Sequence, residues 1–300
     1  MMASQTETKN TFVGMQLETT RQTISQDVIN DYVQRTGDNH PWYTGESPFG
    51  KPVVPAMLTY NWPGHPNTTW YPENIYGNLH ARHEFEWYQP ALAGDTLIGH
   101  RVIVDRYEKR GRVYLVPELT IVRESDGAII LKQRHHQSFL LEGESLQETK
   151  TVAVDKSREQ EATRTRSSHP SDGESLEIFG PISKFVDKAV ADQYSGLKPN
   201  YHNDLEAASD LGFPDIVVQG TLSLSYICEL LTKRFGAGLF VGGRLDIKFV
   251  NVLWVGENIS AKGALRELAR EGGKERAQTT VWTEKDDGTV TIVGQASAVI

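Results

Sequence analysis

The residue of this chain best suited to acid–base chemistry is His202, which lies in the polar loop 194–204. A histidine titrates near pH 6.5, so it can accept or donate a proton close to neutrality. Gly220 follows eighteen residues later (220 − 202 = 18), where the segment VVQG enters an apolar run. A backbone N–H at a helix start points outward at the positive end of the helix dipole, and glycine has no Cβ to obstruct a ligand. The pair could therefore supply a proton acceptor and a donor to an oxyanion.

A second polar loop, residues 36–43, contains Asp38, His40 and Tyr43. Asp38 is a candidate to orient a water molecule, provided that the two loops converge. His40 and Tyr43 are candidates for contact with a substrate. Each residue also has a structural interpretation, because an Asp after Gly37 can cap the next turn and a histidine in a polar loop is commonly solvated or capping.

These loops must be positioned by a scaffold, and the sequence of that scaffold is repeated within the chain. Residues 53–59 read VVPAMLT and residues 217–223 read VVQGTLS, an offset of 217 − 53 = 164. Later turns centred on Gly94 and Gly256 keep an offset of 256 − 94 = 162. A repeat of this length is too long for a solenoid unit and is typical of a duplicated domain.

Helices are predicted at 25–37, 182–196 and 221–236. Ser25 and Ser183 are the expected N-caps of the first two, and a glycine ends each of the three. The third is apolar nearly all round, as expected for a helix buried against a sheet. Its counterpart in the first half is expected to be short or broken, because Pro63, Gly64 and Pro66 interrupt it. Trp62, Trp70, Tyr71 and Tyr76 in the same insertion could wall an acyl group or simply pack.

Strands follow the helices in each half, with β-branched and aromatic residues in rough alternation. They are predicted at 79–90, 96–111, 112–124, 128–142, 245–255, 259–271, 275–286 and 290–300. Helices followed by a meandering antiparallel sheet, twice over, indicate an α+β architecture. Residues 142–175 are rich in charge, Ser and Thr, so we expect most of them to form a linker between halves at 10–141 and 176–300.

Composition narrows the classes of function. The chain has 300 residues, 38% of them hydrophobic, and a net charge of −8, which argues against binding to a nucleic-acid backbone. Its one cysteine, Cys228, excludes an intramolecular disulfide. No apolar run is long enough to span a membrane, and the polar N-terminus resembles no signal peptide. We therefore expect a cytoplasmic protein.

The repeat and its loops resemble the MaoC-type hotdog superfamily, whose nearest branch comprises (R)-specific enoyl-CoA hydratases and hydroxyacyl-thioester dehydratases. The family pattern places an Asp five residues before a His, and a Gly eighteen residues after that His. His202 and Gly220 match the His and Gly, whereas Leu197 occupies the Asp position. In the first loop, Asp38 matches the Asp and Tyr43 replaces the His. Neither half carries the complete dyad.

Some type 2 thioester dehydratases are similar to the version Y-S-x-L-x-x-N-x-H, which Tyr194, Asn200 and His202 fit. The resemblance implies a double hotdog and a hydro-lyase acting on a 2-enoyl or 3-hydroxyacyl thioester of CoA or a carrier. Catalysis would fall to His202, Asn200, Asp38 and Gly220, and substrate contacts to Tyr43, His40, Tyr194 and Gln219. Asn200 would hold a water without acting as a base.

The same fold also hosts acyl-thioester hydrolases and non-catalytic proteins that bind acyl-CoA, so both alternatives stay open. No metal or redox cofactor is implied. His135 and His136 lie next to each other on a predicted strand and should point to opposite faces, which does not suit a metal site. The expected partner is the acyl thioester, with no nucleic acid and no membrane span. Because edge strands of hotdog halves often pair between chains, a homodimer is one expectation.

Overall fold

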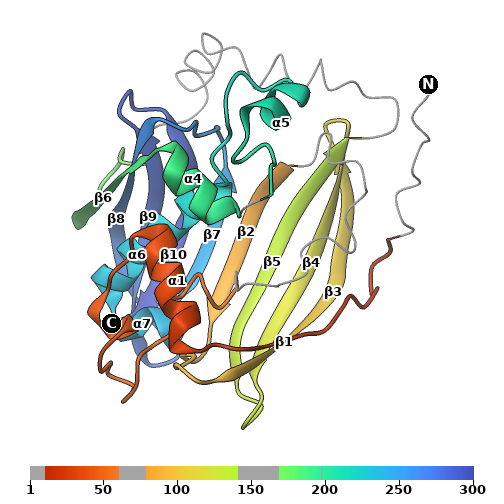
Figure 1. Ribbon diagram of the computed structural model, residues 1–300. Coiled ribbons are helices and arrows are strands. Elements are labelled where there is room, and N and C mark those ends of the chain that lie inside the picture. Colours follow the sequence, from red (N-terminus) through yellow and green to blue (C-terminus); the bar gives the residue numbers. More distant parts are fainter. Residues whose placement is uncertain (1–10, 61–78, 141–168, 197) are drawn as a thin grey trace.

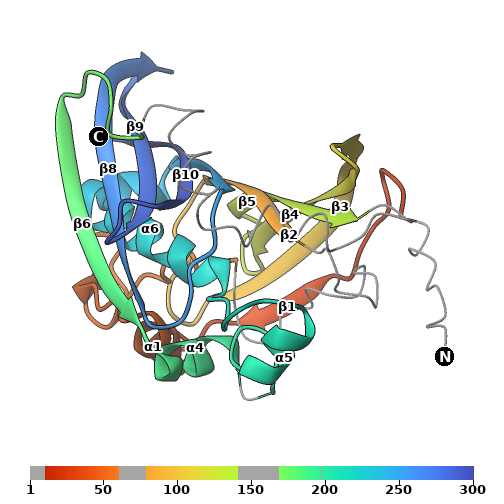
Figure 2. The same cartoon turned by 90° about the horizontal axis from the view of Figure 1, so that it is seen from above.

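A computed structural model describes residues 11–60, 79–140, 169–196 and 198–300 of this chain. Its central feature is one antiparallel sheet of ten strands, in the order β1-β3-β4-β5-β2-β7-β10-β9-β8-β6. The first five belong to the N-terminal half and the last five to the C-terminal half. The halves meet where β2 pairs with β7. The sheet curves around helix α6 in the C-terminal half, and α1 and α4 lie together on the same side (Figures 1 and 2).

The N-terminal half contains helix α1 (Gln26–Thr36), the short 3-10 helix η1 (Pro41–Tyr43) and five strands. The strands are β1 (Thr20–Thr23), β2 (Leu79–Trp87), β3 (Thr96–Lys109), β4 (Arg112–Arg123) and β5 (Ile129–Leu140). Helix α1 matches its prediction at both ends. The Ser25 hydroxyl accepts a hydrogen bond from the Val28 N–H, and Gly37 adopts φ 65°, a left-handed conformation that favours glycine.

The C-terminal half contains helices α4 (Lys188–Ser195), α5 (Leu205–Asp210), α6 (Gly220–Phe235) and α7 (Ala237–Phe240). Its strands are β6 (Glu177–Val186), β7 (Arg244–Phe249), β8 (Glu257–Glu271), β9 (Lys274–Lys285) and β10 (Val290–Val299). The predicted strands in both halves correspond to β2–β5 and β7–β10. None of the described helices is long and apolar enough to cross a membrane.

The N-cap predicted at Ser183 is wrong. Residues 182–186 pair with β8 as part of edge strand β6, and Ser183 faces Ser260 across the ladder. The helix begins only after Asp187, whose carboxylate accepts a hydrogen bond from the Val190 N–H. A ladder formed with a distant strand overrode the local capping signal, which Asp187 fits as well as Ser183 does.

Helix α6 is the centre of the core. Thirteen of its sixteen residues are buried, among them Leu222, Leu224, Ile227 and Leu231. Burial of each such side chain contributes roughly 1.5–3 kcal/mol. The apolar pattern of residues 221–236 predicted this environment, and Gly236 ends the helix as expected.

The sequence repeat is matched by equivalent backbone hydrogen bonds. In the first half the Val53 N–H donates to the Trp42 carbonyl, at 2.8 Å. In the second, the Val217 N–H donates to the Tyr201 carbonyl, at 3.2 Å. In each half, the segment that begins with this valine is thus hydrogen-bonded to its polar loop, so the two loops are held in the same way. The boundaries proposed for the halves and for the linker stay a prediction, since most of the linker lies outside the described residues.

Candidate functional site

The loop that carries His202 is held by a network of amide side chains. The Asn200 Oδ1 accepts a hydrogen bond from the His202 N–H at 2.9 Å, and its Nδ2 donates to the Lys198 carbonyl. Asn203, which is buried, donates through Nδ2 to the Gly196 and Lys198 carbonyls. Asn200 thus positions His202 through the backbone. Its expected contact with a water stays a prediction.

The His202 ring has a defined tautomer. Its Nδ1 lies 2.8 Å from the Val217 carbonyl oxygen, which can only accept a hydrogen bond, so Nδ1 carries the proton. Nε2 is therefore the basic nitrogen of the neutral ring. Burial lowers the pKa of His202 to about 4, so the ring is neutral at pH 7. The neutral His202 ring can therefore accept a proton at Nε2.

Gly220 is the first residue of α6, three residues after the Val217 that fixes the His202 ring. The preceding residue, Gln219, makes no side-chain cap to the helix, and no protein acceptor for the Gly220 N–H is recorded within the described ranges. The backbone of Gly220 packs tightly against Phe249, because a Cβ built there would lie 2.8 Å from the Phe249 Cε1. The N–H of Gly220 thus lies at a helix start, and its predicted role as an oxyanion donor stays a prediction.

The other two residues expected on this side have different surroundings. The Gln219 Oε1 accepts a weak hydrogen bond from the Ser195 hydroxyl, at 3.4 Å, which ties α4 to the start of α6. Tyr194 is buried, and it lies close enough to Tyr32 and Tyr226 to raise the pKa of each. Tyr194 therefore packs between helices. Its predicted contact with substrate, like that of Gln219, stays a prediction.

Asp38 and Tyr43 form a buried pair. The Tyr43 hydroxyl donates a hydrogen bond to the Asp38 Oδ2 at 3.0 Å, so the residues that stand at the family's Asp and His positions touch directly. Burial, reinforced by the nearby charge of Glu229, raises the pKa of Asp38 to about 7. The Asp38 Oδ1 is also buried, and it has no hydrogen-bond partner among the described residues.

The Asp38 pair adjoins the C-terminal part of α6. Tyr43 also shares a side-chain hydrogen bond with Thr232, and Glu229 forms ion pairs with Lys184 and Lys233. Thr232 lies twelve residues along α6 from Gly220 (232 − 220 = 12), which is about 18 Å at 1.5 Å per residue. Asp38 and His202 therefore lie near opposite ends of the helix. The condition under which Asp38 was a candidate to act beside His202, convergence of the two loops, is therefore not met for these two residues.

His40 accompanies the Asp38 pair and is remote from His202 for the same reason. Its Nδ1 accepts a hydrogen bond from the Trp42 N–H, and its ring lies 5.5 Å from that of Tyr43. Burial lowers the pKa of His40. Leu197 and the aromatic residues predicted to wall an acyl group lie outside the described residues, so their predicted roles stay predictions.

Sequence reasoning missed three residues that shape this site: Val217, Asn203 and Phe249. The hydrogen bond from His202 to the Val217 carbonyl had a usable signal, because VVQG repeats VVPA and must meet its loop in the same way. Asn203 lies within the polar loop, where an amide that bonds to its own backbone is common. Phe249 had no comparable signal, since its contact with Gly220 joins β7 to α6.

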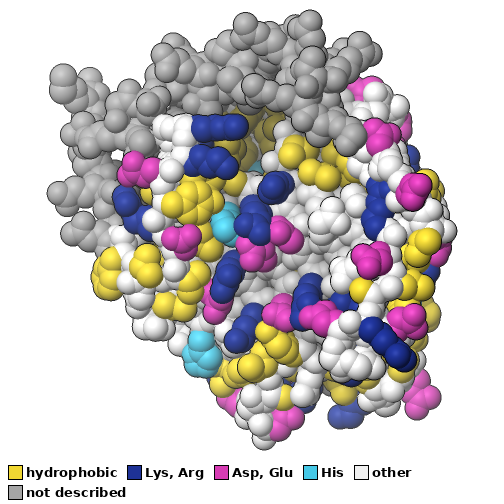
Figure 3. Space-filling model, turned by 180° about the vertical axis from the view of Figure 1, so that it is seen from behind, with side chains coloured by type: hydrophobic (Ala, Val, Ile, Leu, Met, Phe, Trp, Pro, Cys, Tyr) yellow, Lys and Arg dark blue, Asp and Glu magenta, His cyan; other side chains and the backbone are white. Residues whose placement is uncertain are grey.

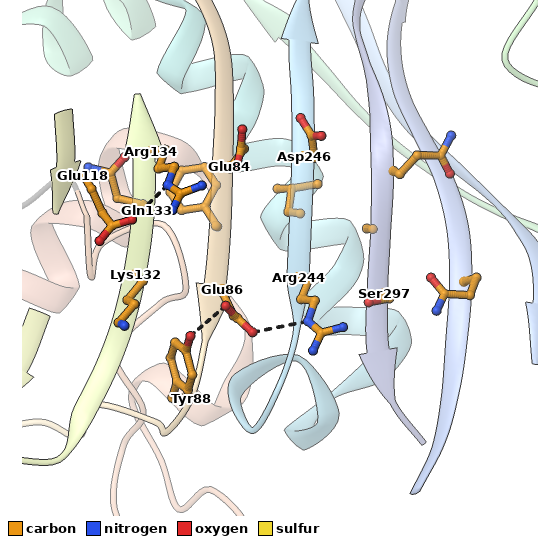
Figure 4. A pocket seen from close by; sticks show the side chains of 15 residues that line it. Glu84, Glu86, Tyr88, Glu118, Lys132, Gln133, Arg134, Arg244, Asp246 and Ser297 are labelled. Carbon is orange, nitrogen blue, oxygen red and sulfur yellow. Dashed lines mark hydrogen bonds and ion pairs between the residues drawn. The ribbon is translucent and has the colours of Figure 1, made fainter. Parts of the chain in front are cut away.

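A cavity of about 510 Å³ lies on the opposite, convex face of the sheet. Among its charged side chains, Arg244 is paired with Glu86 and Arg134 with Glu118 (Figure 4). Acidic and basic groups alternate around a hollow on this face (Figure 3). No candidate residue of the His202 loop lines the cavity, so it is separate from the proposed chemistry.

No group of three metal-ligating side chains occurs among the described residues. The neighbours His135 and His136 point to opposite faces, as predicted. His135 lies near His83 on the inner face, whereas His136 contacts Glu84 through Nε2 at 3.0 Å.

Residues 11–133 match a family model described as FAS1-like, dehydratase domain region. Among solved structures, a protein named MaoC-like dehydratase is 14% identical, covers 96% of this chain and 98% of its own, and has a TM-score of 0.72. A MaoC-like dehydratase from Phytophthora capsici is 16% identical over 96% of each chain, with a TM-score of 0.65. A conserved hypothetical protein from Mycobacterium tuberculosis, described as a double hotdog fold, is 10% identical over 96% of each chain, with a TM-score of 0.62. No curated protein matches significantly. The predicted α+β double-hotdog fold is confirmed.

Proposed function

We propose that this chain, which has the double-hotdog fold of proteins named MaoC-like dehydratase, is a hydro-lyase for a 2-enoyl or 3-hydroxyacyl thioester. The thioester would be carried by CoA or by an acyl carrier. His202 is the acid–base residue and the Gly220 N–H is the oxyanion donor. The observation that supports these roles best is the hydrogen bond from His202 to the Val217 carbonyl, which leaves Nε2 free to accept a proton.

In the hydration direction, Nε2 of His202 takes a proton from water while the water oxygen bonds to C3 of the enoyl group. The π electrons move towards C2 and the carbonyl, and the negative charge on the thioester oxygen is stabilised by the Gly220 N–H. The imidazolium then returns its proton to C2, which restores the thioester and the neutral ring. Dehydration is the reverse sequence. The reaction therefore consumes only water, and His202 is the one group that carries a proton between steps.

The lowered pKa of His202 suits this cycle. A base with a pKa of about 4 is always in its neutral form near pH 7, and its conjugate acid is strong enough to protonate an enolate carbon readily. No carboxylate contact to the His202 ring is recorded in the described part of the chain, and a backbone carbonyl orients it instead. Asp38 is left out of this mechanism because it lies near the far end of α6.

The test follows crotonyl-CoA by two signals, the absorbance of the conjugated enoyl thioester and the release of free thiol. Loss of absorbance without thiol release supports hydration, and thiol release would instead identify a thioesterase. Binding without either signal, over short and long acyl chains, would identify a non-catalytic acyl-CoA-binding protein.

His202→Gln should reduce hydration by at least about 100-fold, the usual contribution of a positioned acid–base group. His100→Gln is the matched control, because His100 is exposed on β3. Unchanged turnover in a folded His202→Gln variant would refute the assignment. Assembly as a homodimer and a cytoplasmic location remain part of the proposal, and sedimentation of the purified chain tests the first.

A further inference from the structure

A second group of titratable side chains lies on the inner face of the N-terminal half, where only His80 is partly exposed. The Nδ1 of His83 lies 2.9 Å from the Nε2 of His80, and the Nε2 of His83 lies 2.5 Å from the Gln133 Oε1. The rings of His80 and His135 are 3.9 Å apart. Tyr60 reaches the Nδ1 of His135 at 3.4 Å. We call His80, His83, Gln133 and His135 the histidine cluster.

The hydrogen bonds of the histidine cluster fix its protons. The Gln133 Oε1 can only accept, so the Nε2 of His83 is a donor and its Nδ1 is an acceptor in the neutral ring. The Nε2 of His80 must then donate to the Nδ1 of His83. This leaves the Nδ1 of His80 as the acceptor of that ring, and no partner for it is recorded among the residues that the structure describes. Burial lowers the pKa of His80 and His83 well below 6.5, so both rings are neutral.

The corresponding positions of the C-terminal half are apolar. His83 pairs with His135 across β2 and β5, and Leu245 pairs with Ala296 across β7 and β10, at offsets of 245 − 83 = 162 and 296 − 135 = 161. Small and aliphatic residues there allow α6 to pack on the sheet. Hydrogen-bonded polar groups at a core position usually contribute less to stability than well-packed apolar ones. The histidine cluster is therefore better explained by recognition than by packing.

The histidine cluster adjoins the proposed active site through one side chain. Phe249 packs against the backbone of Gly220 on one side, and its ring lies 4.4 Å from that of His80 on the other. His202, Gly220, Phe249 and His80 are each partly exposed, whereas His83 is fully buried. A thioester whose oxygen reached the Gly220 N–H could thus extend its acyl chain across Phe249 to His80.

We propose that the histidine cluster is a specificity subsite for an acyl chain that carries a hydroxyl group, which donates a hydrogen bond to the Nδ1 of His80. This inference rests on the proposed function, since it takes the thioester to lie at Gly220. A hydroxyl suits the subsite because the free position on His80 is an acceptor. A simple alkyl chain would leave that acceptor buried without a partner.

The test compares binding with turnover. Titration calorimetry measures the Kd of saturated acyl-CoA pairs of five, six and seven carbons, each with and without a terminal hydroxyl. At the matching length, the hydroxylated chain should bind about tenfold more tightly, the effect of one well-formed buried hydrogen bond. The subsite is refuted if no hydroxylated chain binds better than its alkyl counterpart, or if a terminal carboxylate binds better than the hydroxyl.

Variants then test which side chain produces the preference for a hydroxylated acyl chain. His80→Phe should bring the hydroxyl-to-alkyl ratio close to one while keeping an aromatic contact with Phe249. His83→Leu, which installs the residue of the C-terminal half, should weaken the ratio if His80→Phe does not fold. Arg134→Gln is the control, because Arg134 neighbours His135 but points to the convex face and is half-exposed. An unchanged ratio in a folded His80→Phe variant overturns the assignment.

The corresponding enoyl-CoA pairs separate this inference from the proposed function. If wild-type protein hydrates alkyl and hydroxylated enoyl chains with equal kcat/KM and binds them equally, the function stands and the subsite fails. If hydroxylated chains bind more tightly but no chain is hydrated, the subsite stands and the hydro-lyase fails.

Discussion

Replacement of Asp38 by Asn should stabilise the protein at alkaline pH. The pKa of Asp38 is raised from 3.8 to about 7, chiefly by burial, so the folded chain retains a proton that the unfolded chain loses. The carboxyl therefore destabilises the folded state as pH rises from 3.8 to about 7, and the penalty is complete above that range. Roughly three pKa units at 1.36 kcal/mol each amount to about 4 kcal/mol. Asn has no such penalty, and its carbonyl can still accept the hydrogen bond from Tyr43.

Urea unfolding at pH 5 and at pH 8 measures this effect. The stability advantage of Asp38→Asn over wild type should grow by about 3 kcal/mol between these values, because at pH 5 only part of the penalty is present. Asp31→Asn is the matched control, since Asp31 is partly exposed on α1 and pairs with Arg35. A constant difference across the two pH values would show that Asp38 ionises normally. Hydration by Asp38→Asn should persist, because Asp38 lies near the far end of α6.

Three further outcomes are expected. If His202 is the base, kcat/KM should stay level from pH 8 to pH 5 and fall about tenfold per unit only below about pH 4, where Nε2 becomes protonated; a decline beginning near pH 6.5 would contradict the burial argument. Gly220→Ala should lose most activity because its Cβ would meet Phe249, and Phe249→Leu in the same chain should restore part of it if crowding is the cause, as steady-state kinetics would measure. Asp187→Ala should lower the free energy of unfolding by about 1 kcal/mol through loss of the α4 cap, and an unchanged urea midpoint would count against that cap.

Most of the scaffold could be predicted because its signals are local. Alternation in the strands, the apolar run of α6 and the Ser25 and Gly37 caps of α1 each depend on neighbouring residues alone. Strand β6 could not be predicted in this way. Its residues pair with β8, some eighty positions later, and Ser183 offered a helix cap that was locally plausible.

The site was predictable to a lesser extent. The sequence placed His202 and Gly220 in one half at a spacing typical of the family, and the structure holds both segments through Val217. It could not show which end of α6 the Asp38 loop meets, because that depends on how the halves pack. Nor could it show that Asn200 uses both ends of its amide on the backbone.

The pairing of β2 with β7 has a consequence for stoichiometry. The two unequal halves belong to one chain and are also joined by this one ladder, with Arg82 bound to Asp246 across the junction. In an assembly of identical single halves, every change to a loop appears in each site at once. Here the loop with Tyr43 and the loop with His202 can change separately. On the proposed function, one chain should therefore take up a single thioester per two hotdog units, and the N-terminal unit, which lacks a counterpart of His202, is free to serve recognition.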